Sequence, residues 1–126
     1  MWALGNFNIY DCSVTLNGDD GIYIQFANNL SFTNVIVKNN NVSNGYSGGI
    51  IVRESNGTRF NSCQFYDNRV PPIQRYGISI EGSVDYVGLV NCKLLPNKIS
   101  AVYNSAGAVI NRSNVGQILT ALGGAR

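Results

Sequence analysis

The chain has 126 residues, enough for one domain, and a formal net charge of +2 from nine basic and seven acidic residues. So weak a charge does not indicate binding to nucleic acid or to an anionic membrane. The chain has no histidine, which excludes Ser-His and Cys-His nucleophiles and the commonest zinc ligand.

Targeting and cofactor signals are also missing from the sequence. Residues 1–5 have neither a basic segment nor an apolar stretch long enough for a secretory signal peptide. No apolar run approaches the roughly 18 residues that a membrane-spanning helix needs. The three cysteines are odd in number and lack the spacing of a metal site. The sequence therefore predicts no metal, no cofactor, and no membrane or nucleic-acid partner.

Two short apolar patterns alternate along the chain. Both favour strands, because they are rich in Val, Ile, Phe and Tyr. One pattern begins at Gly21, Gly49 and Gly77, at a constant interval of 28 residues. Self-similarity at a period of this size indicates a solenoid. In chain order the segments are 9–14, 21–24, 32–37, 49–52, 60–65, 77–80, 89–94, 101–104 and a weaker copy at 110–115.

Side-chain alternation predicts which residues face the interior. In the segment after Gly21, Ile22 and Ile24 point inward and Tyr23 and Gln25 outward, since successive side chains of a strand alternate. The later copies place Ile50, Val52, Ile78 and Ile80 inward and Ile51, Arg53, Ser79 and Glu81 outward. We interpret the outward row Gln25, Arg53 and Glu81 as a structural ladder on neighbouring coils.

The other pattern contains a corner. Its first two inward positions are three residues apart, an odd step that a straight strand does not allow. We predict the corners at Asp11, Asn34, Ser62 and Asn91, where polar side chains bond the turning backbone. The inward row beyond these corners is Cys12, Val35, Cys63 and Cys92, and we expect Cys63 and Cys92 to be buried free thiols.

These features together resemble the right-handed parallel β-helix of the pectate-lyase-like superfamily, which includes phage tailspikes and tail-associated depolymerases. The resemblance covers residues 6–115 and depends on the hydrophobic–x–hydrophobic strands, the asparagines at corners and the glycine before a strand. It implies an all-β, right-handed parallel β-helix of about four to five coils.

The resemblance also implies a setting. We expect residues 1–126 to form a single β-helix domain that is a fragment of, or a module from, a longer solenoid, because so short a solenoid leaves open ends. By analogy with tailspikes we expect a homotrimer in a virion or extracellular location.

Two longer connections predict a binding face. The links at 38–48 and 66–76 have eleven residues each, whereas the equivalent links elsewhere have six. Insertions at equivalent positions of a solenoid emerge on one face, which is often the binding face. The candidate catalytic carboxylates there are Asp19, Asp20 and Asp67, and the candidate substrate-binding residues are Tyr46, Tyr66, Arg69, Arg75 and Tyr76.

This set of side chains suits a glycan. Tyrosine rings stack on sugars, guanidinium groups bind acidic substituents, and two carboxylates can supply acid and base. By register Asp20, Gly48 and Tyr76 should lie one above another, with Gly48 leaving a slot for a sugar ring and Asp67 and Arg75 reaching in.

The aspartates also admit a simpler interpretation. Residues 18–21, Gly-Asp-Asp-Gly, are equally suited to a tight polar turn. Polygalacturonase-like relatives use aspartates near such turns, and residues 17–21 look similar, but their second motif includes a histidine that this chain lacks.

Two functions remain open on the sequence. The first is a glycan-binding or glycan-cleaving module of a tailspike-like protein, which would bind a polysaccharide or cell-surface glycan and, if catalytic, act as a hydrolase or lyase through carboxylates. The alternative is a purely structural β-helix segment of a virion spike or adhesin.

Overall fold

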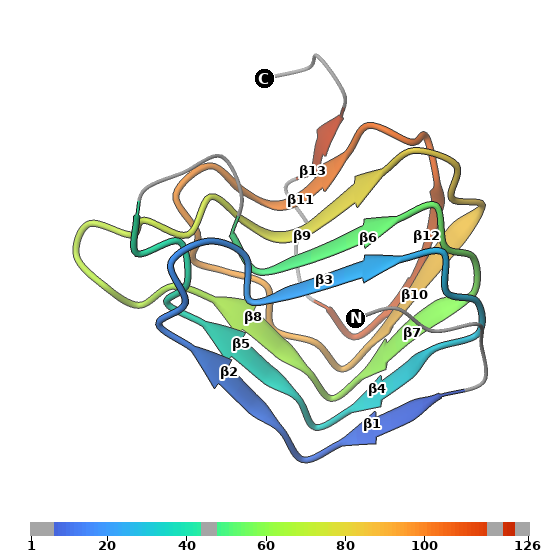
Figure 1. The fold of residues 1–126 in the computed structure, drawn as a ribbon, viewed down its shortest axis with the longest axis horizontal. Helices are drawn as coiled ribbons and strands as arrows, with labels where there is room; N and C mark the ends of the chain where they lie inside the picture. The colour runs from blue at the N-terminus through green and yellow to red at the C-terminus, as the bar shows by residue number, and fades with distance from the viewer. Residues whose placement is uncertain (1–6, 44–47, 116–119, 123–126) are drawn as a thin grey trace.

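The computed structural model describes residues 7–43, 48–115 and 120–122. In these ranges the chain forms thirteen strands, all of which pair in parallel within three sheets (Figure 1). The described residues include no helix long and apolar enough to cross a membrane.

The three sheets form three walls around a common interior, called walls A, B and C below. Wall A contains β3 (Ile22–Gln25), β6 (Ile50–Arg53), β9 (Tyr76–Glu81), β11 (Ser100–Asn104) and β13 (Thr120–Leu122). Wall B contains β1 (Asn8–Tyr10), β4 (Ser31–Thr33), β7 (Thr58–Asn61), β10 (Tyr86–Val90) and β12 (Val109–Ser113). Wall C contains β2 (Ser13–Thr15), β5 (Ile36–Lys38) and β8 (Gln64–Tyr66), and a bridge from Gln64 to Lys93 extends it by one coil.

From β1 to β9 the chain visits the walls in the order B, C, A three times, so equivalent strands of successive coils lie side by side (Figure 1). Ile22 pairs with Ile50, and Ile50 with Ile78, in the register that the glycine interval predicts. Ile50 and Ile78 are almost completely buried in one core. The prediction of an all-β parallel β-helix with these isoleucines stacked inside is confirmed.

The interior of wall B is a column of aromatic rings. Phe32 and Phe60 are fully buried on adjacent coils, and their rings stack with centroids 5.0 Å apart. Phe65 meets Phe60 edge-on from wall C, also at 5.0 Å. These contacts connect two walls across the core.

The cysteine row is correctly predicted in part. Cys63 and Cys92 are buried and free, and each thiol contacts a carbonyl oxygen of wall B. Burial raises the pKa of Cys63 to about 11, so the thiol stays protonated at neutral pH. Cys12, in contrast, is exposed, because its coil is the first in the described part of the chain and has a neighbour on one side only.

The predicted corners are present. Asp11, Asn34, Ser62 and Asn91 all have left-handed backbone, with φ between 53° and 54°. Asparagine and aspartate tolerate this conformation better than most residues, because their short side chains bond locally. At this corner the Asn34 amide donates to the carboxylate of Asp11 on the coil before, at 2.8 Å.

The repeated glycine is required for close approach between coils. A Cβ atom on Gly49 would overlap the carbonyl oxygen of Gly77 on the next coil. Because that oxygen is backbone, no side-chain movement relieves the contact. We expect Gly49→Ala to lower the free energy of unfolding by about 1–3 kcal/mol, the usual cost of overpacking, as measured by urea denaturation.

Gly88→Ala provides the matched control for this substitution. A Cβ on Gly88, in the middle of β10, would lie 3.4 Å from the Cγ atom of Arg59, which is ordinary van der Waals contact. We expect Gly88→Ala to be neutral or slightly stabilising, since alanine restricts the unfolded chain. Equal losses of stability in the two variants would contradict the close-approach argument.

Candidate functional site

A groove of about 480 Å³ crosses the outer face of wall A. The outward residues of four successive strands line it, because the strands pair in register and their side chains alternate. Its lining includes Tyr23 of β3, Ile51 and Arg53 of β6, Ser79 and Glu81 of β9, and Tyr103 of β11. The volume lies within the roughly 300–1,000 Å³ that is usual for ligand pockets.

The floor of the groove is formed by Ile51 and Ser79, the two middle residues of one outward column. Tyr23, Ile51, Ser79 and Tyr103 are consecutive partners in the sheet register. Ile51 is 7% exposed and Ser79 is 6% exposed, although both point away from the core. The larger groove side chains therefore rise around them, and the small Ser79 leaves the hollow between Ile51 and Tyr103.

Two tyrosines form an aromatic surface in the groove. The rings of Tyr76 and Tyr103 stack with centroids 5.1 Å apart and planes 19° from parallel. Tyr76 is almost buried and Tyr103 is partly exposed. Tyr103 therefore offers the groove a ring whose orientation the neighbouring coil fixes.

Opposite charges adjoin one another in the groove. Arg53 pairs in register with Glu81 on the next strand. The pKa of Arg53 is raised above its ordinary value, mainly by a hydrogen bond with Tyr23. The negative charges of Glu81 and Glu54 raise this pKa further. The Ser79 hydroxyl donates to Glu81 Oε2 at 2.9 Å, which orients that carboxylate.

The structure brings three of the predicted site residues into this groove, namely Asp20, Arg75 and Tyr76. Asp20 Oδ1 accepts a hydrogen bond from the Gly48 amide at 3.1 Å, as expected for residues one coil apart. The predicted slot at Gly48 is wrong, however. Gly48 is buried, and a Cβ there would lie 2.8 Å from the Tyr76 carbonyl oxygen, so no space for a sugar ring remains.

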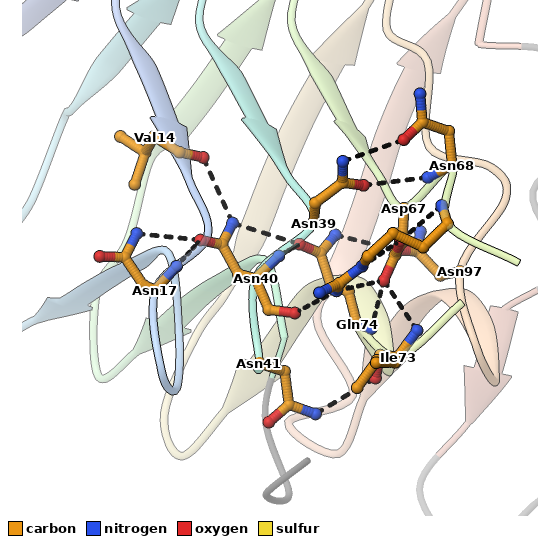
Figure 2. Close-up of polar contacts among 11 residues, drawn as sticks. Val14, Asn17, Asn39, Asn40, Asn41, Asp67, Asn68, Ile73, Gln74 and Asn97 are labelled. Carbon is orange, nitrogen blue, oxygen red and sulfur yellow. Dashed lines mark hydrogen bonds and ion pairs between the residues drawn. The ribbon is translucent and has the colours of Figure 1, made fainter. Parts of the chain in front are cut away.

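Asp67 and Arg69 lie away from the groove, in the loop between β8 and β9. The Asp67 carboxylate is fully buried and accepts five hydrogen bonds, from the amide and guanidinium of Arg69 and from the amides of Ile73 and Gln74. Figure 2 shows Asp67 facing Ile73 and Gln74 inside this loop. The expectation that Asp67 reaches into the site is wrong, because the loop itself uses both carboxylate oxygens.

The remaining predicted residues are spread over other surfaces. Tyr66 is on the outer face of wall C, where the Lys93 ammonium lies 4.2 Å from its ring centroid and that of Lys38 lies 5.9 Å away. Asp19 is exposed in its turn, and its carbonyl oxygen accepts from the Asn41 amide. Tyr46 lies outside the described residues.

A ladder of side-chain amides fixes the corner beside the groove (Figure 2). Asn40 Oδ1 accepts from Asn17 Nδ2 at 2.9 Å, Asn40 Nδ2 donates to Gln74 Oε1 at 3.2 Å, and Gln74 Nε2 donates to Asn97 Oδ1 at 2.9 Å. The ladder gives one amide per coil. These side-chain bonds fix the loops that carry Asp20 and Arg75 relative to one another along the stack of coils.

A sequence signal for this ladder exists, although the ladder was not predicted. Asn17, Asn40 and Asn97 each follow an inward residue of wall C by three positions. Asn68 has the same spacing, but the long loop carries it onto Asn39, with which it exchanges two hydrogen bonds, and Gln74 takes the place in the ladder.

Most of the groove lining is not indicated as a site by the sequence, since seven of its ten described residues lie outside the predicted set. The sequence indicates Tyr23, Ser79 and Tyr103 as outward strand positions and Arg53 and Glu81 as a structural ladder, with no sign that they share a site. Their outward alternation was the available signal. Their common location on one face became apparent only when four coils were stacked.

Metal ligands do not gather in the part of the chain that the structure describes, where no three Asp, Glu, Cys or His side chains are close enough to hold an ion. The groove itself offers tyrosine rings, two guanidinium groups and the carboxylates of Asp20 and Glu81.

Comparison with known proteins gives one match. The family model described as a right-handed β-helix region matches residues 4–120. Searches of curated proteins and of solved structures found no match. The matched range contains all of the walls except the last two residues of β13. The chain belongs to the right-handed β-helix family.

Proposed function

We propose that this β-helix is a glycan-binding module and that the groove on wall A is its binding site. The observation that carries the proposal is the stacked pair Tyr76 and Tyr103 beside charged hydrogen-bonding groups, above a floor that is almost buried. A tyrosine ring offers a sugar an apolar face, and fixed polar groups beside it can bind the hydroxyls.

A pre-organised groove is what separates this function from a purely structural one. Ser79 orients Glu81, the Gly48 amide binds Asp20, and Tyr76 holds the ring of Tyr103. Groups that are already ordered lose little entropy when a ligand binds. A segment that served only as a stiff spacer would not need this arrangement.

Cleavage is the second candidate, and it would use either Asp20 or Glu81. These are the two carboxylates among the groove lining, and they come from different coils. A hydrolase needs two carboxyl groups about 5–10 Å apart. Asp20 is level with Tyr76 in the register, whereas Glu81 follows Tyr76 by five residues of β9 at about 3.3 Å each, so the two cannot form one acid–base pair and cleavage would depend on one of them as the acid or base. The setting would be the virion spike or extracellular depolymerase that the sequence resembles.

Tyr103→Ala tests the binding site. A glycan array identifies the ligands of the wild-type protein, and titration calorimetry then compares the variants. We expect Tyr103→Ala to weaken binding about tenfold, because stacking on an aromatic ring contributes up to about 1.5 kcal/mol. Tyr103→Phe, which keeps the ring, should bind nearly as well as the wild type.

The control is Tyr10→Ala, since Tyr10 is 57% exposed on β1 of wall B, in a different sheet from the groove. Release of reducing ends from the bound glycan separates cleavage from binding: a hydrolase should lose turnover in Asp20→Asn or Glu81→Gln while it still binds. If the wild type binds no arrayed glycan, or if Tyr103→Ala and Tyr10→Ala bind alike, the structural interpretation is favoured instead.

A further inference from the structure

We infer that the groove on wall A accepts an uncharged glycan and discriminates against acidic ones. This inference rests on the proposed function and specifies the class of its ligand. It departs from the sequence-based expectation that arginines here bind acidic substituents.

The first argument is the charge of the lining. Arg53 and Arg75 contribute two positive charges, and Asp20 and Glu81 contribute two negative charges. The formal charge of the lining is therefore zero. An acidic polysaccharide is attracted to a surface with an excess of positive charge, and this lining has no such excess.

The second argument is that Arg53 already lies beside carboxylates. Arg53 is beside Glu81 in the sheet register, and both Glu81 and Glu54 attract it. Arg75 shares the groove with Asp20. An incoming carboxylate would compete with Glu81 for the Arg53 guanidinium, and both Glu81 and Asp20 would repel it.

Residues just outside the lining do not reverse the balance. Asp19 and Glu54 adjoin Asp20 and Arg53 in the chain, against one positive charge, Lys98, in the loop before β11. The groove and its margin thus provide no net attraction for an anion.

Wall C provides the contrast within the same molecule. Lys38 and Lys93 lie over the ring of Tyr66, and strands β2, β5 and β8 contain no Asp or Glu. An acidic polymer that adsorbs through charge alone should prefer this face. Any test must therefore separate binding in the groove from adsorption to wall C.

The experiment uses polymers that share a backbone and differ in charge. Hydroxyethylcellulose is compared with carboxymethylcellulose, dextran with dextran sulfate, and fully methyl-esterified polygalacturonate with polygalacturonate. Affinity electrophoresis in native gels measures each dissociation constant for the wild type, Tyr103→Ala and Lys93→Ala, at low and at high salt. Tyr103→Ala reports the groove, and Lys93→Ala reports adsorption to wall C.

We expect Tyr103-dependent binding of at least one uncharged polymer, with an affinity that salt changes by less than about twofold because no ion pairs form. The acidic polymer of each pair should bind only weakly, and this binding should depend on Lys93 and disappear at high salt. Tyr103-dependent binding that is stronger for the acidic member of a pair and is lost in salt would overturn this inference and leave the proposed function intact. If no polymer of either kind shows Tyr103-dependent binding, both are overturned.

A double variant gives an independent test. Asp20→Asn with Glu81→Gln keeps an oxygen acceptor for the Gly48 amide and for Ser79, and changes the lining charge from zero to +2. We expect carboxymethylcellulose to bind this variant about tenfold more tightly than the wild type at low salt. An unchanged affinity would show that the carboxylates do not exclude anions, which would also overturn the inference.

Discussion

Asp67→Asn is expected to lower the free energy of unfolding by about 3 kcal/mol, because it removes one partner of a buried ion pair. The carboxylate is fully buried, whereas the Arg69 side chain retains 24% exposure. The carboxylate accepts five hydrogen bonds. An asparagine amide would place its own N–H hydrogens against some of the same donor groups. The Arg69 guanidinium also donates to the Asn40 carbonyl oxygen, so the substitution should loosen two coils.

The pH dependence of stability provides a second measurement of the same carboxylate. Burial alone would raise the pKa of Asp67, but hydrogen bonds from Arg69 and from the amides of Gln74 and Ile73 outweigh it and lower the pKa to about 2. In the unfolded chain the pKa is about 3.9. A lowered pKa contributes stability that is complete well above the unfolded value and is lost as the pH falls through the folded value.

The difference in stability between the wild type and Asp67→Asn should therefore be constant from about pH 5 upward and shrink between about pH 4 and pH 2. Urea denaturation at each pH measures it. Asp19→Asn is the control, since Asp19 is exposed in a nearby turn, and it should change stability by no more than about 0.5 kcal/mol. A difference between wild type and Asp67→Asn that did not vary down to pH 2 would contradict the role of this carboxylate.

Phe60→Ala is the second large effect, with an expected decrease in unfolding free energy of about 3–5 kcal/mol. The Phe60 ring is fully buried between Phe32 on the coil before and Phe65 of wall C. Its removal leaves a cavity that the stacked strands cannot close, because their backbone spacing is fixed by interstrand hydrogen bonds. The substitution should also weaken the packing of wall B against wall C.

Urea denaturation measures this decrease in unfolding free energy as a lower midpoint, and we expect the m-value to stay unchanged. Phe7→Ala makes the same chemical change at a side chain that is 51% exposed, and we expect it to cost no more than about 1 kcal/mol. Equal effects of the two substitutions would show that the phenylalanine column does not hold the walls together.

The coil and its register could be predicted from the amino-acid sequence alone. Gly21, Gly49 and Gly77 define the interval, and the alternation beside them identifies the isoleucines that stack inside. The corners followed too, since an odd step between inward residues requires a bend, and Asp11 and Asn34 suit left-handed backbone. These features repeat every coil and depend on neighbours close in the chain.

The composition of the candidate site, in contrast, emerged only when the coils were stacked. Tyr23 and Tyr103 are 80 positions apart in the sequence, and each alone resembles an ordinary outward strand residue. Stacking puts them in one column with the small Ser79 between, and this creates the groove.

Asp67 is the opposite case. A charged residue in a long loop looks available for chemistry, but the structure buries its carboxylate completely. Its partners Ile73 and Gln74 meet it only when that loop folds back. They bind it through backbone amides, which every residue except proline carries, so no residue pattern in the sequence could have indicated these contacts.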